Sequence, residues 1–255
     1  MQAQFPNTDL SQCTPAQGAA TSRLDEQDIE EWNDLFQYLT APARVELALR
    51  FFPGTHVLSS SFGAQAAVSL HLLSQAAPEI PVVLVDTGYL FPETYEFVEQ
   101  LTTQLNLNLH VYRSLRSPAE QEASDGQRWL QGESGLDAYN LENKVEPMNR
   151  ALEELSTGTW ITGIRRSQSE HRQDTPFVQQ KRQGERDLIK VSPLADWSDK
   201  DVFEYLKRFD LPYHPLWHQG YVSVGDTHTT RSIYEVDDES QVRFFGIKRE
   251  CGLHL

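Results

Sequence analysis

The sequence predicts an α/β protein with a mostly parallel sheet flanked by helices. Short apolar segments alternate along the chain with longer segments of helical periodicity, the order that builds a parallel sheet covered on both faces. Residues Pro81 to Val85 are continuously apolar, as in a strand buried on both sides. We therefore expect one α/β domain at residues 23–234, between a disordered segment at 1–22 and a mobile C-terminal tail at 235–255.

The individual elements follow from apolar spacing and from turn residues. Apolar side chains recur at helical spacing between Asp25 and Leu39, and Pro53 with Gly54 separates the second helix from the first strand. Ser198 followed by Asp201 is a capping box that opens the last helix. The predicted helices are 25–39, 42–51, 64–75, 92–105, 145–155 and 198–209. The predicted strands are 56–59, 81–86, 109–112, 159–162 and 188–191.

Three loops follow predicted strands and therefore lie at the carboxyl edge of the sheet, where α/β proteins bind ligands. They are Ser59-Ser60-Ser61-Phe62-Gly63, Asp86-Thr87-Gly88 and Gly163-Ile164-Arg165-Arg166. Hydroxyl and backbone N–H groups ahead of a helix favour an anion, although serines at a helix start also act as caps. The serine loop is neither a P-loop nor a Gly-x-Gly-x-x-Gly turn. Asp86 is interpreted either as an acceptor for sugar or base donors or as a helix cap.

The charge distribution indicates a small anionic ligand. A net charge of −15 argues against nucleic acid or a membrane surface as partner, because both would be repelled. The basic residues nevertheless cluster, and arginines form bidentate contacts with phosphate or sulfate. Lys144 either adds a cation to this site or forms a surface salt bridge with Glu142 or Glu146. The clustered candidates are Arg165, Arg166 and Arg172 in one stretch, and Arg243, Lys248 and Arg249 near the end of the chain.

The two cysteines, Cys13 and Cys251, differ in their surroundings. They form no disulfide framework, and no signal peptide or apolar span is evident, so we expect a cytoplasmic protein. Lys248 and Arg249 precede Cys251 and His254 follows it, and such neighbours stabilise the reactive thiolate. Cys251 is therefore the candidate nucleophile, although a chance cysteine in a disordered terminus is the alternative. Cys13 has no basic neighbour, and we expect it to be dispensable.

A zinc site is the remaining possibility for the histidines. His214 and His218, together with Cys251 and His254, would provide four ligands of suitable types. Pro215 disfavours a helical pairing of the first two, and the chain has no second cysteine pair. We therefore expect no metal.

Five motifs together resemble the phosphoadenosine phosphosulfate (PAPS) reductases, thioredoxin-dependent enzymes of assimilatory sulfate reduction, from about Val57 to His254. The motifs are Lys248 to His254, Tyr213 to Trp217, Gly225 to Arg231, Asn143 to Met148 and Val85 to Gly88. The resemblance implies an adenine-nucleotide α-hydrolase-like fold and a homodimer. It also implies that PAPS is reduced to sulfite and adenosine 3′,5′-bisphosphate through an S-sulfocysteine on Cys251, with thioredoxin or glutaredoxin as electron donor and no bound cofactor. The expected substrate-binding residues are Ser59, Ser60, Ser61, Gly63, Asp86, Thr87, Gly88, Lys144, Gly163, Arg165, Arg166, Arg172, Arg243, Lys248, Arg249 and His254.

Relatives that reduce adenosine phosphosulfate (APS) carry an iron–sulfur cluster on four cysteines. The corresponding stretches here, 144–147 and 224–229, contain none, which favours the cluster-free branch that uses PAPS. APS reduction is the nearest alternative. An ATP-pyrophosphatase-type ligase or thiolation enzyme would need a Ser-Gly-Gly-x-Asp-Ser loop, which the sequence lacks. A nucleotide sensor without catalysis is the third alternative.

Overall fold

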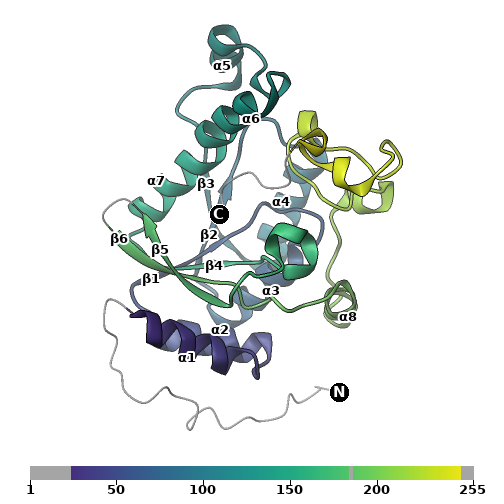
Figure 1. Ribbon diagram of the computed structural model, residues 1–255. Coiled ribbons are helices and arrows are strands. Elements are labelled where there is room, and N and C mark those ends of the chain that lie inside the picture. Colours follow the sequence, from purple (N-terminus) through teal and green to yellow (C-terminus); the bar gives the residue numbers. More distant parts are fainter. Residues whose placement is uncertain (1–23, 184–185, 248–255) are drawn as a thin grey trace.

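A six-stranded sheet forms the centre of the protein, whose computed structural model describes residues 24–183 and 186–247 (Figure 1). The strand order is β3-β2-β1-β4-β6-β5. Every neighbouring pair is parallel except β5 with β6, so the predicted mostly parallel α/β class is confirmed. The strands are β1 (Thr55–Ser59), β2 (Pro81–Val85), β3 (Asn108–Tyr112), β4 (Thr157–Thr162), β5 (Val178–Gln183) and β6 (Arg186–Val191). The predicted disorder at 1–22 lies outside the described residues.

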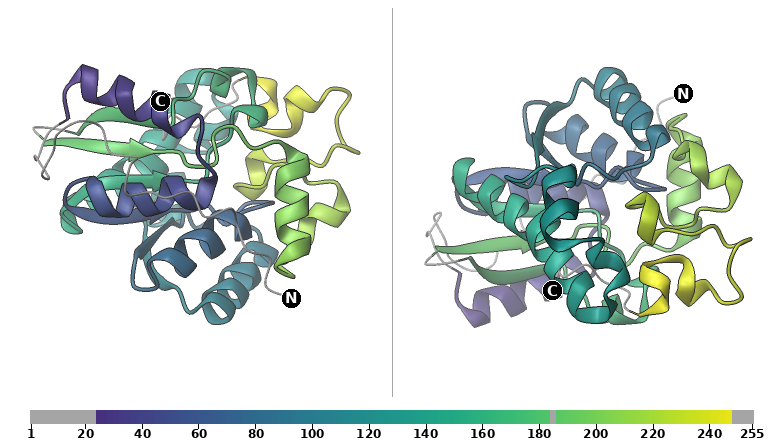
Figure 2. Two further views of the ribbon diagram at one scale, coloured as in Figure 1. Left: turned by 90° about the horizontal axis from the view of Figure 1, so that it is seen from below. Right: turned by 90° about the horizontal axis from the view of Figure 1, so that it is seen from above.

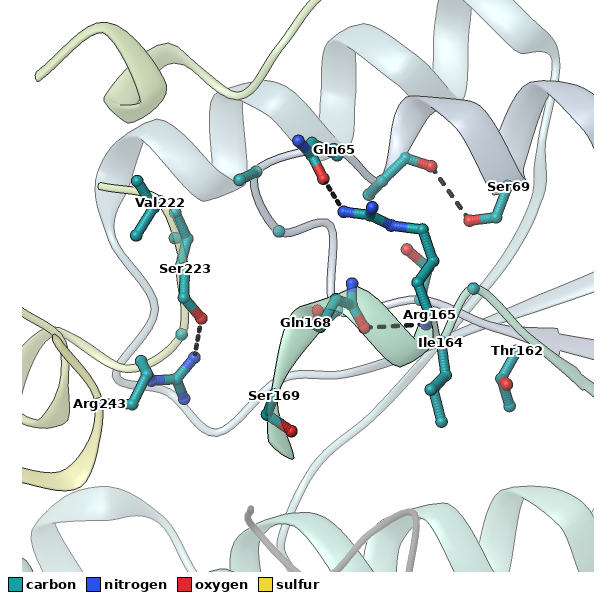
Figure 3. Close-up of a pocket in the computed structure, with 18 of the residues that line it drawn as sticks. Gln65, Ser69, Thr162, Ile164, Arg165, Gln168, Ser169, Val222, Ser223 and Arg243 are labelled. Carbon is teal, nitrogen blue, oxygen red and sulfur yellow. Dashed lines mark hydrogen bonds between the residues drawn. The ribbon is translucent and has the colours of Figure 1, made fainter. Parts of the chain in front are cut away.

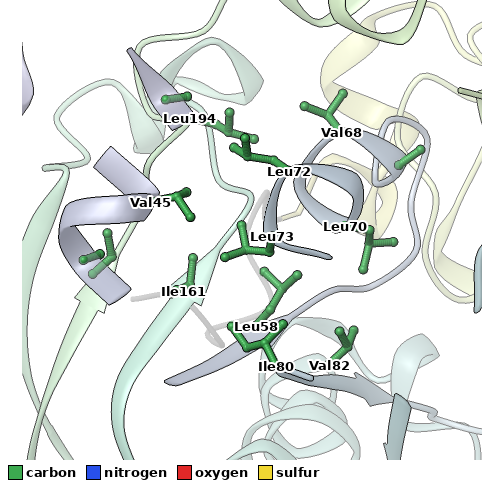
Figure 4. Close-up of a cluster of buried hydrophobic side chains, with 14 of the residues drawn as sticks. Val45, Leu58, Val68, Leu70, Leu72, Leu73, Ile80, Val82, Ile161 and Leu194 are labelled. Carbon is green, nitrogen blue, oxygen red and sulfur yellow. The ribbon is translucent and has the colours of Figure 1, made fainter. Parts of the chain in front are cut away.

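Both faces of the sheet are covered, because alternate residues of each strand point to opposite sides. Leu58, Val82 and Ile161 face a large cluster that includes Val45 of α2 and Leu70 and Leu73 of α3 (Figure 4). Their sequence neighbours face a smaller cluster on the other side, closed by α7. The helices are α1 (Glu26–Phe36), α2 (Ala41–Phe51), α3 (Ala67–Ala76), α4 (Pro92–Leu105), α5 (Pro118–Asp125), α6 (Gly132–Asn140), α7 (Glu146–Glu154) and α8 (Asp199–Arg208). Among the described residues, no helix is long and apolar enough to cross a membrane.

Three regions differ from the sequence prediction, and one of them is helix α5, which was not predicted. The predicted helix 145–155 is the last part of a longer helical run, in which α6 passes through a π-helical turn, Leu141–Val145, into α7. The antiparallel strand β5 was not predicted, because Val178–Gln183 is mostly polar, as is common for an edge strand. The other predicted elements are present, with ends shifted by a few residues.

The last part of the described chain forms a lobe beyond one end of the sheet, coloured green to yellow in both views of Figure 2. Its regular structure consists of short 3₁₀ helices, Pro215–Gln219, Thr227–Thr229, Glu239–Val242 and Phe244–Gly246. Arg231 N–H donates to the Val242 carbonyl at 2.9 Å, and the Phe244 side chain is buried. The described part of the predicted tail, residues 235–247, thus packs against the preceding chain, and the mobility of the tail stays a prediction.

Candidate active site

A cavity of about 430 Å³ lies between the carboxyl edge of the sheet and the C-terminal lobe (Figure 3). One side, here called the sheet wall, consists of Ser59, Ser60, Ser61 and Gly63 at the end of β1, Thr87 after β2 and Gly163–Arg165 after β4. The opposite side, the lobe wall, consists of residues 222–226 and 242–244. Lys144 of the π-helical turn also lines the cavity. The predicted convergence of loops at this edge of the sheet is therefore present.

The serine loop is fixed by contacts with the sheet and does not cap a helix. The indole N–H of Trp160 donates to Ser59 Oγ at 2.7 Å, and Phe62 N–H donates to Ser60 Oγ at 3.1 Å. Helix α3 begins only at Ala67, and its N-cap residue, Ala66, makes no side-chain capping bond. The alternative that the serines cap this helix is therefore wrong. Ser60 and Ser61 line the cavity instead.

Gly163 allows β4 to end close to α3. A Cβ atom at this position would lie 2.8 Å from Ser69 Oγ and 3.1 Å from Ser69 Cβ. A larger residue would therefore require Ser69 or the strand end to shift.

The two adjacent arginines have different surroundings. Arg165 is 4% exposed and lines the cavity, where its guanidinium donates to Gln65 and, at 3.0 Å, to Asp199 (Figure 3). Arg166 donates from Nε to the Thr175 carbonyl at 2.8 Å and stacks on Phe177. Among the described residues Arg165 belongs to the cavity lining and Arg166 does not, so the geometry does not support the predicted role of Arg166. Arg172 does line the cavity and donates to Gln168.

The Asp86 side chain makes its hydrogen bonds outside the cavity. Its carboxylate accepts hydrogen bonds from Tyr95 Oη at 2.8 Å, Arg113 Nε at 2.8 Å and Gly88 N–H at 2.9 Å. Burial, followed by the hydrogen bond to this carboxylate, raises the pKa of Tyr95 to about 12. Within the described part of the chain, neither Asp86 nor Gly88 lines the cavity, whereas Thr87 between them does. Of these three residues Thr87 alone has a place in the cavity lining, and contact of any of them with a ligand stays a prediction.

Lys144 forms a buried ion pair with a residue that the sequence analysis did not assign. Its ammonium lies 2.7 Å from Asp226 Oδ2, and the two side chains are 11% and 1% exposed. Burial alone would raise the pKa of Asp226, but the Lys144 ammonium and the hydrogen bonds from Lys144 and Thr87 outweigh this effect and lower the pKa to about 2. The predicted alternative, a surface salt bridge with Glu142 or Glu146, is wrong, because these carboxylates bind arginines.

Arg243 is positioned from the lobe wall. Its Nη1 donates to Ser223 Oγ at 3.3 Å (Figure 3), and its guanidinium carbon lies 5.0 Å from the centre of the Phe244 ring. A Cβ atom on Gly225 would lie 2.6 Å from Cζ of Arg243. Gly225 is therefore needed for the guanidinium to lie against the backbone of this loop.

His214 has a structural role. It is fully buried, Nδ1 accepts from Leu216 N–H at 3.1 Å, and Nε2 lies 3.0 Å from Thr94 Oγ1. Burial lowers the pKa of His214 to about 4. Both ring nitrogens of His214 already have hydrogen-bond partners, so His214 is not available as a zinc ligand. Cys251, Lys248, Arg249 and His254 lie outside the described residues, as does Cys13.

Sequence reasoning missed Asp226, Gln65 and Ser223 as parts of the site. Asp226 lies in one of the motifs that carry the resemblance, but no charge pattern connects it with Lys144. Residues 144–147 and 224–229, the two stretches without cysteine noted in the sequence, meet in space through the ion pair between Lys144 and Asp226.

The chain is similar to known proteins over most of its length. The model of the phosphoadenosine phosphosulfate reductase domain matches residues 55–232. Phosphoadenosine 5′-phosphosulfate reductase of Xanthomonas oryzae pv. oryzae is 57% identical, over 94% of this chain and 97% of its own. The enzyme of the same name from Xylella fastidiosa is 58% identical, over 89% of this chain and 94% of its own.

Solved structures support the fold. The PAPS reductase of Candida auris, determined as a phosphate complex, superposes with a TM-score of 0.71 at 28% identity, over 84% of this chain and all of that one. FMN adenylyltransferase of Candida glabrata reaches a TM-score of 0.56 at 15% identity, over 82% and 72% of the two chains, and is similar in fold alone. The adenine-nucleotide α-hydrolase-like fold is thereby confirmed.

Proposed function

The chain belongs to the phosphoadenosine phosphosulfate reductase family, and from this premise we propose that it reduces PAPS to sulfite and adenosine 3′,5′-bisphosphate. The observation that carries the proposal on the structural side is the cation-lined cavity at the carboxyl edge of the sheet. Lys144, Arg165, Arg172 and Arg243 all line it. Its volume of about 430 Å³ lies within the range of small-molecule sites.

Two features of the cavity suit a nucleotide with several negative charges. Arginines bind phosphate and sulfate oxygens through parallel N–H donors. The hydroxyl groups of Ser60 and Ser61, which line the cavity ahead of α3, add neutral donors close to a helix N-terminus. The cations thus neutralise charge on the phosphates and on the leaving group as it forms.

Cys251 is the proposed nucleophile. Its thiolate attacks the sulfur atom of the sulfate group, a bond forms between the two sulfur atoms, and the bond from sulfur to the phosphate oxygen breaks. Adenosine 3′,5′-bisphosphate leaves with the electron pair, and an S-sulfocysteine remains. Lys248, Arg249 and His254 are proposed to stabilise the thiolate.

A dithiol protein, thioredoxin or glutaredoxin, is the proposed electron donor. Its thiolate attacks Cys251 Sγ, so that sulfite leaves with the electron pair of the bond between the two sulfur atoms. The second thiol of the donor then attacks the mixed disulfide, which frees Cys251 and leaves the donor oxidised. We further propose a homodimer in the cytoplasm, where such donors are kept reduced.

Sulfite release by the purified protein from PAPS and from APS, with and without reduced thioredoxin, tests the proposal. We expect release from PAPS that depends on thioredoxin. A preference for APS together with bound iron would instead identify an APS reductase. Binding of PAPS without any turnover would identify a sensor.

Substitution of each cysteine tests the mechanism. Cys251→Ser should abolish sulfite release while nucleotide binding persists, because serine is not a nucleophile toward this sulfur at neutral pH. Cys13→Ser is the matched control and should release sulfite at the normal rate. Substantial turnover by Cys251→Ser would rule out the S-sulfocysteine.

A further inference from the structure

Asp226 occupies an unusual place for a carboxylate. It is 1% exposed, yet it borders the cavity together with both of its partners, Lys144 and Thr87. Oδ2 lies 2.7 Å from the Lys144 ammonium, and Oδ1 accepts the Thr87 hydroxyl at 2.6 Å. The three residues come from three separate parts of the chain, namely the lobe wall, the π-helical turn and the loop after β2.

A buried carboxylate is costly unless it is paired and hydrogen-bonded, so this arrangement restricts both partners. Lys144 is restricted on a second side as well. Its ammonium lies 5.1 Å from the centre of the Phe244 ring and 5.5 Å from that of Tyr139. A lysine side chain is otherwise flexible, and Asp226 with the two rings fixes the direction from which its ammonium faces the cavity.

We propose that Asp226 is a positioning residue for nucleotide binding, which holds the Lys144 ammonium toward an anionic oxygen of the ligand and is itself oriented by Thr87. The inference rests on the proposed function for the identity of the nucleotide. An ammonium has three N–H donors, so the bond to Asp226 leaves donors for the ligand. Asp226 touches the ligand only through Lys144 in this account.

The direction in which Asp226→Asn changes nucleotide affinity distinguishes a positioning role from a simple effect of charge. Asp226→Asn removes a negative charge from a site that binds an anion, so electrostatics alone predicts tighter binding. Positioning predicts the opposite, because the uncharged amide no longer holds the ammonium in place. Calorimetry with adenosine 3′,5′-bisphosphate measures this affinity without any turnover.

We expect Asp226→Asn to weaken the binding of adenosine 3′,5′-bisphosphate at least about fivefold and to lower kcat/KM for PAPS by about tenfold or more. In a Lys144→Met background the same substitution should change affinity by less than about twofold, because its effect passes through the lysine. Additive losses in the two backgrounds, or tighter binding by Asp226→Asn, would overturn the inference.

Two further variants show whether weaker binding by Asp226→Asn results from a folding defect. Thr87→Val keeps both charges and removes only the hydroxyl donor, so it should weaken binding a few-fold in the wild type but not with Lys144→Met. Asp196→Asn is the matched control, since it breaks a pair with buried Arg44 outside the cavity lining and should lower the unfolding midpoint without weakening binding. If Asp226→Asn does not fold, the double-mutant cycle of Thr87→Val and Lys144→Met decides the inference. Additive effects of these two substitutions on binding affinity would overturn it.

The result also separates this inference from the proposed function. A wild type that binds the nucleotide but releases no sulfite from PAPS contradicts the proposed function, and the binding cycle still decides the role of Asp226. Normal sulfite release combined with unchanged binding by Asp226→Asn contradicts only the role of Asp226.

Discussion

The two walls of the cavity are held in place by different forces. Behind the sheet wall lie the large and the smaller apolar cluster on the two faces of the sheet, so its loops start from strands fixed by hydrophobic burial. The lobe wall has short 3₁₀ helices, small apolar clusters and single polar contacts, such as Thr227 N–H to the Tyr89 carbonyl at 2.9 Å. Hydrophobic packing therefore holds the sheet wall in place, whereas single polar contacts set the geometry of the lobe wall.

The largest effect on stability is expected behind the sheet wall. Leu73 is fully buried in the cluster beneath β1, and Leu73→Ala should lower the free energy of unfolding by about 2–5 kcal/mol. Turnover per folded molecule should stay normal, because the site loops are not touched. Urea unfolding measures the loss, with Leu130→Ala, at a position 65% exposed, as the control. A large loss of turnover in folded Leu73→Ala would mean that the core and the site are not separable.

Among changes to the two walls, the largest effect on turnover is expected in the lobe wall. Gly225→Ala would place a methyl group 2.6 Å from Cζ of Arg243 and displace the guanidinium. Sulfite release from PAPS should fall by about 100-fold, the scale of an ångström-sized misplacement. The free energy of unfolding should change by less than about 1 kcal/mol, because a flexible side chain moves instead of the backbone.

Arg243→Ala provides the reference for that experiment. It should reproduce the loss in turnover, and the double variant should be no worse than either single one. Normal sulfite release by Gly225→Ala would show that catalysis does not depend on the position of the Arg243 guanidinium.

The attachment of the lobe should be sensitive to pH through His214. Burial holds its pKa near 4 in the folded protein, whereas the unfolded chain binds the proton near pH 6.5. The unfolded chain binds a proton that the folded ring does not, so the protein is most stable above about pH 6.5. Stability is lost as pH falls toward 4, by about 3 kcal/mol. His214→Asn should flatten this part of the stability curve. An equally steep curve for the variant would assign the slope to other groups.

The smallest effect concerns the hydrogen bond that orients Arg243. The distance from Nη1 to Ser223 Oγ is 3.3 Å, which is long for such a bond. Ser223→Ala should lower kcat/KM for PAPS only about threefold, and the unfolding midpoint should stay unchanged. A loss as large as that of Gly225→Ala would mean that this bond, and not the space above Gly225, positions the guanidinium.

The contrast between the packed sheet wall and the lobe wall also explains which parts of the structure could be predicted from the sequence. Strands β1, β2 and β4 were found because apolar runs mark buried strands, and their carboxyl ends locate Ser59, Thr87 and Gly163 at one edge. The ion pair between Lys144 and Asp226 was not found, because its members lie far apart in the chain and share no periodic pattern.

Local backbone geometry explains a second miss. Arg165 has an extended conformation, with φ −129° and ψ 145°, and successive side chains of an extended chain point to opposite sides. Arg165 and Arg166 therefore cannot both face the cavity, although their adjacency suggested a pair. Of the neighbours Asp86 and Thr87, likewise only Thr87 lines the cavity.

Hydrogen–deuterium exchange with and without adenosine 3′,5′-bisphosphate tests most directly that both walls form one nucleotide site. Protection of backbone amides reports local opening, and a ligand that bridges the walls should suppress opening in each of them. We predict slower exchange at residues 59–66, which include the serine loop of the sheet wall, and at 222–230, which include part of the lobe wall. The effect should be larger in the lobe, where single contacts hold the chain. Protection confined to the sheet wall, with unchanged exchange at 222–230, would contradict the account.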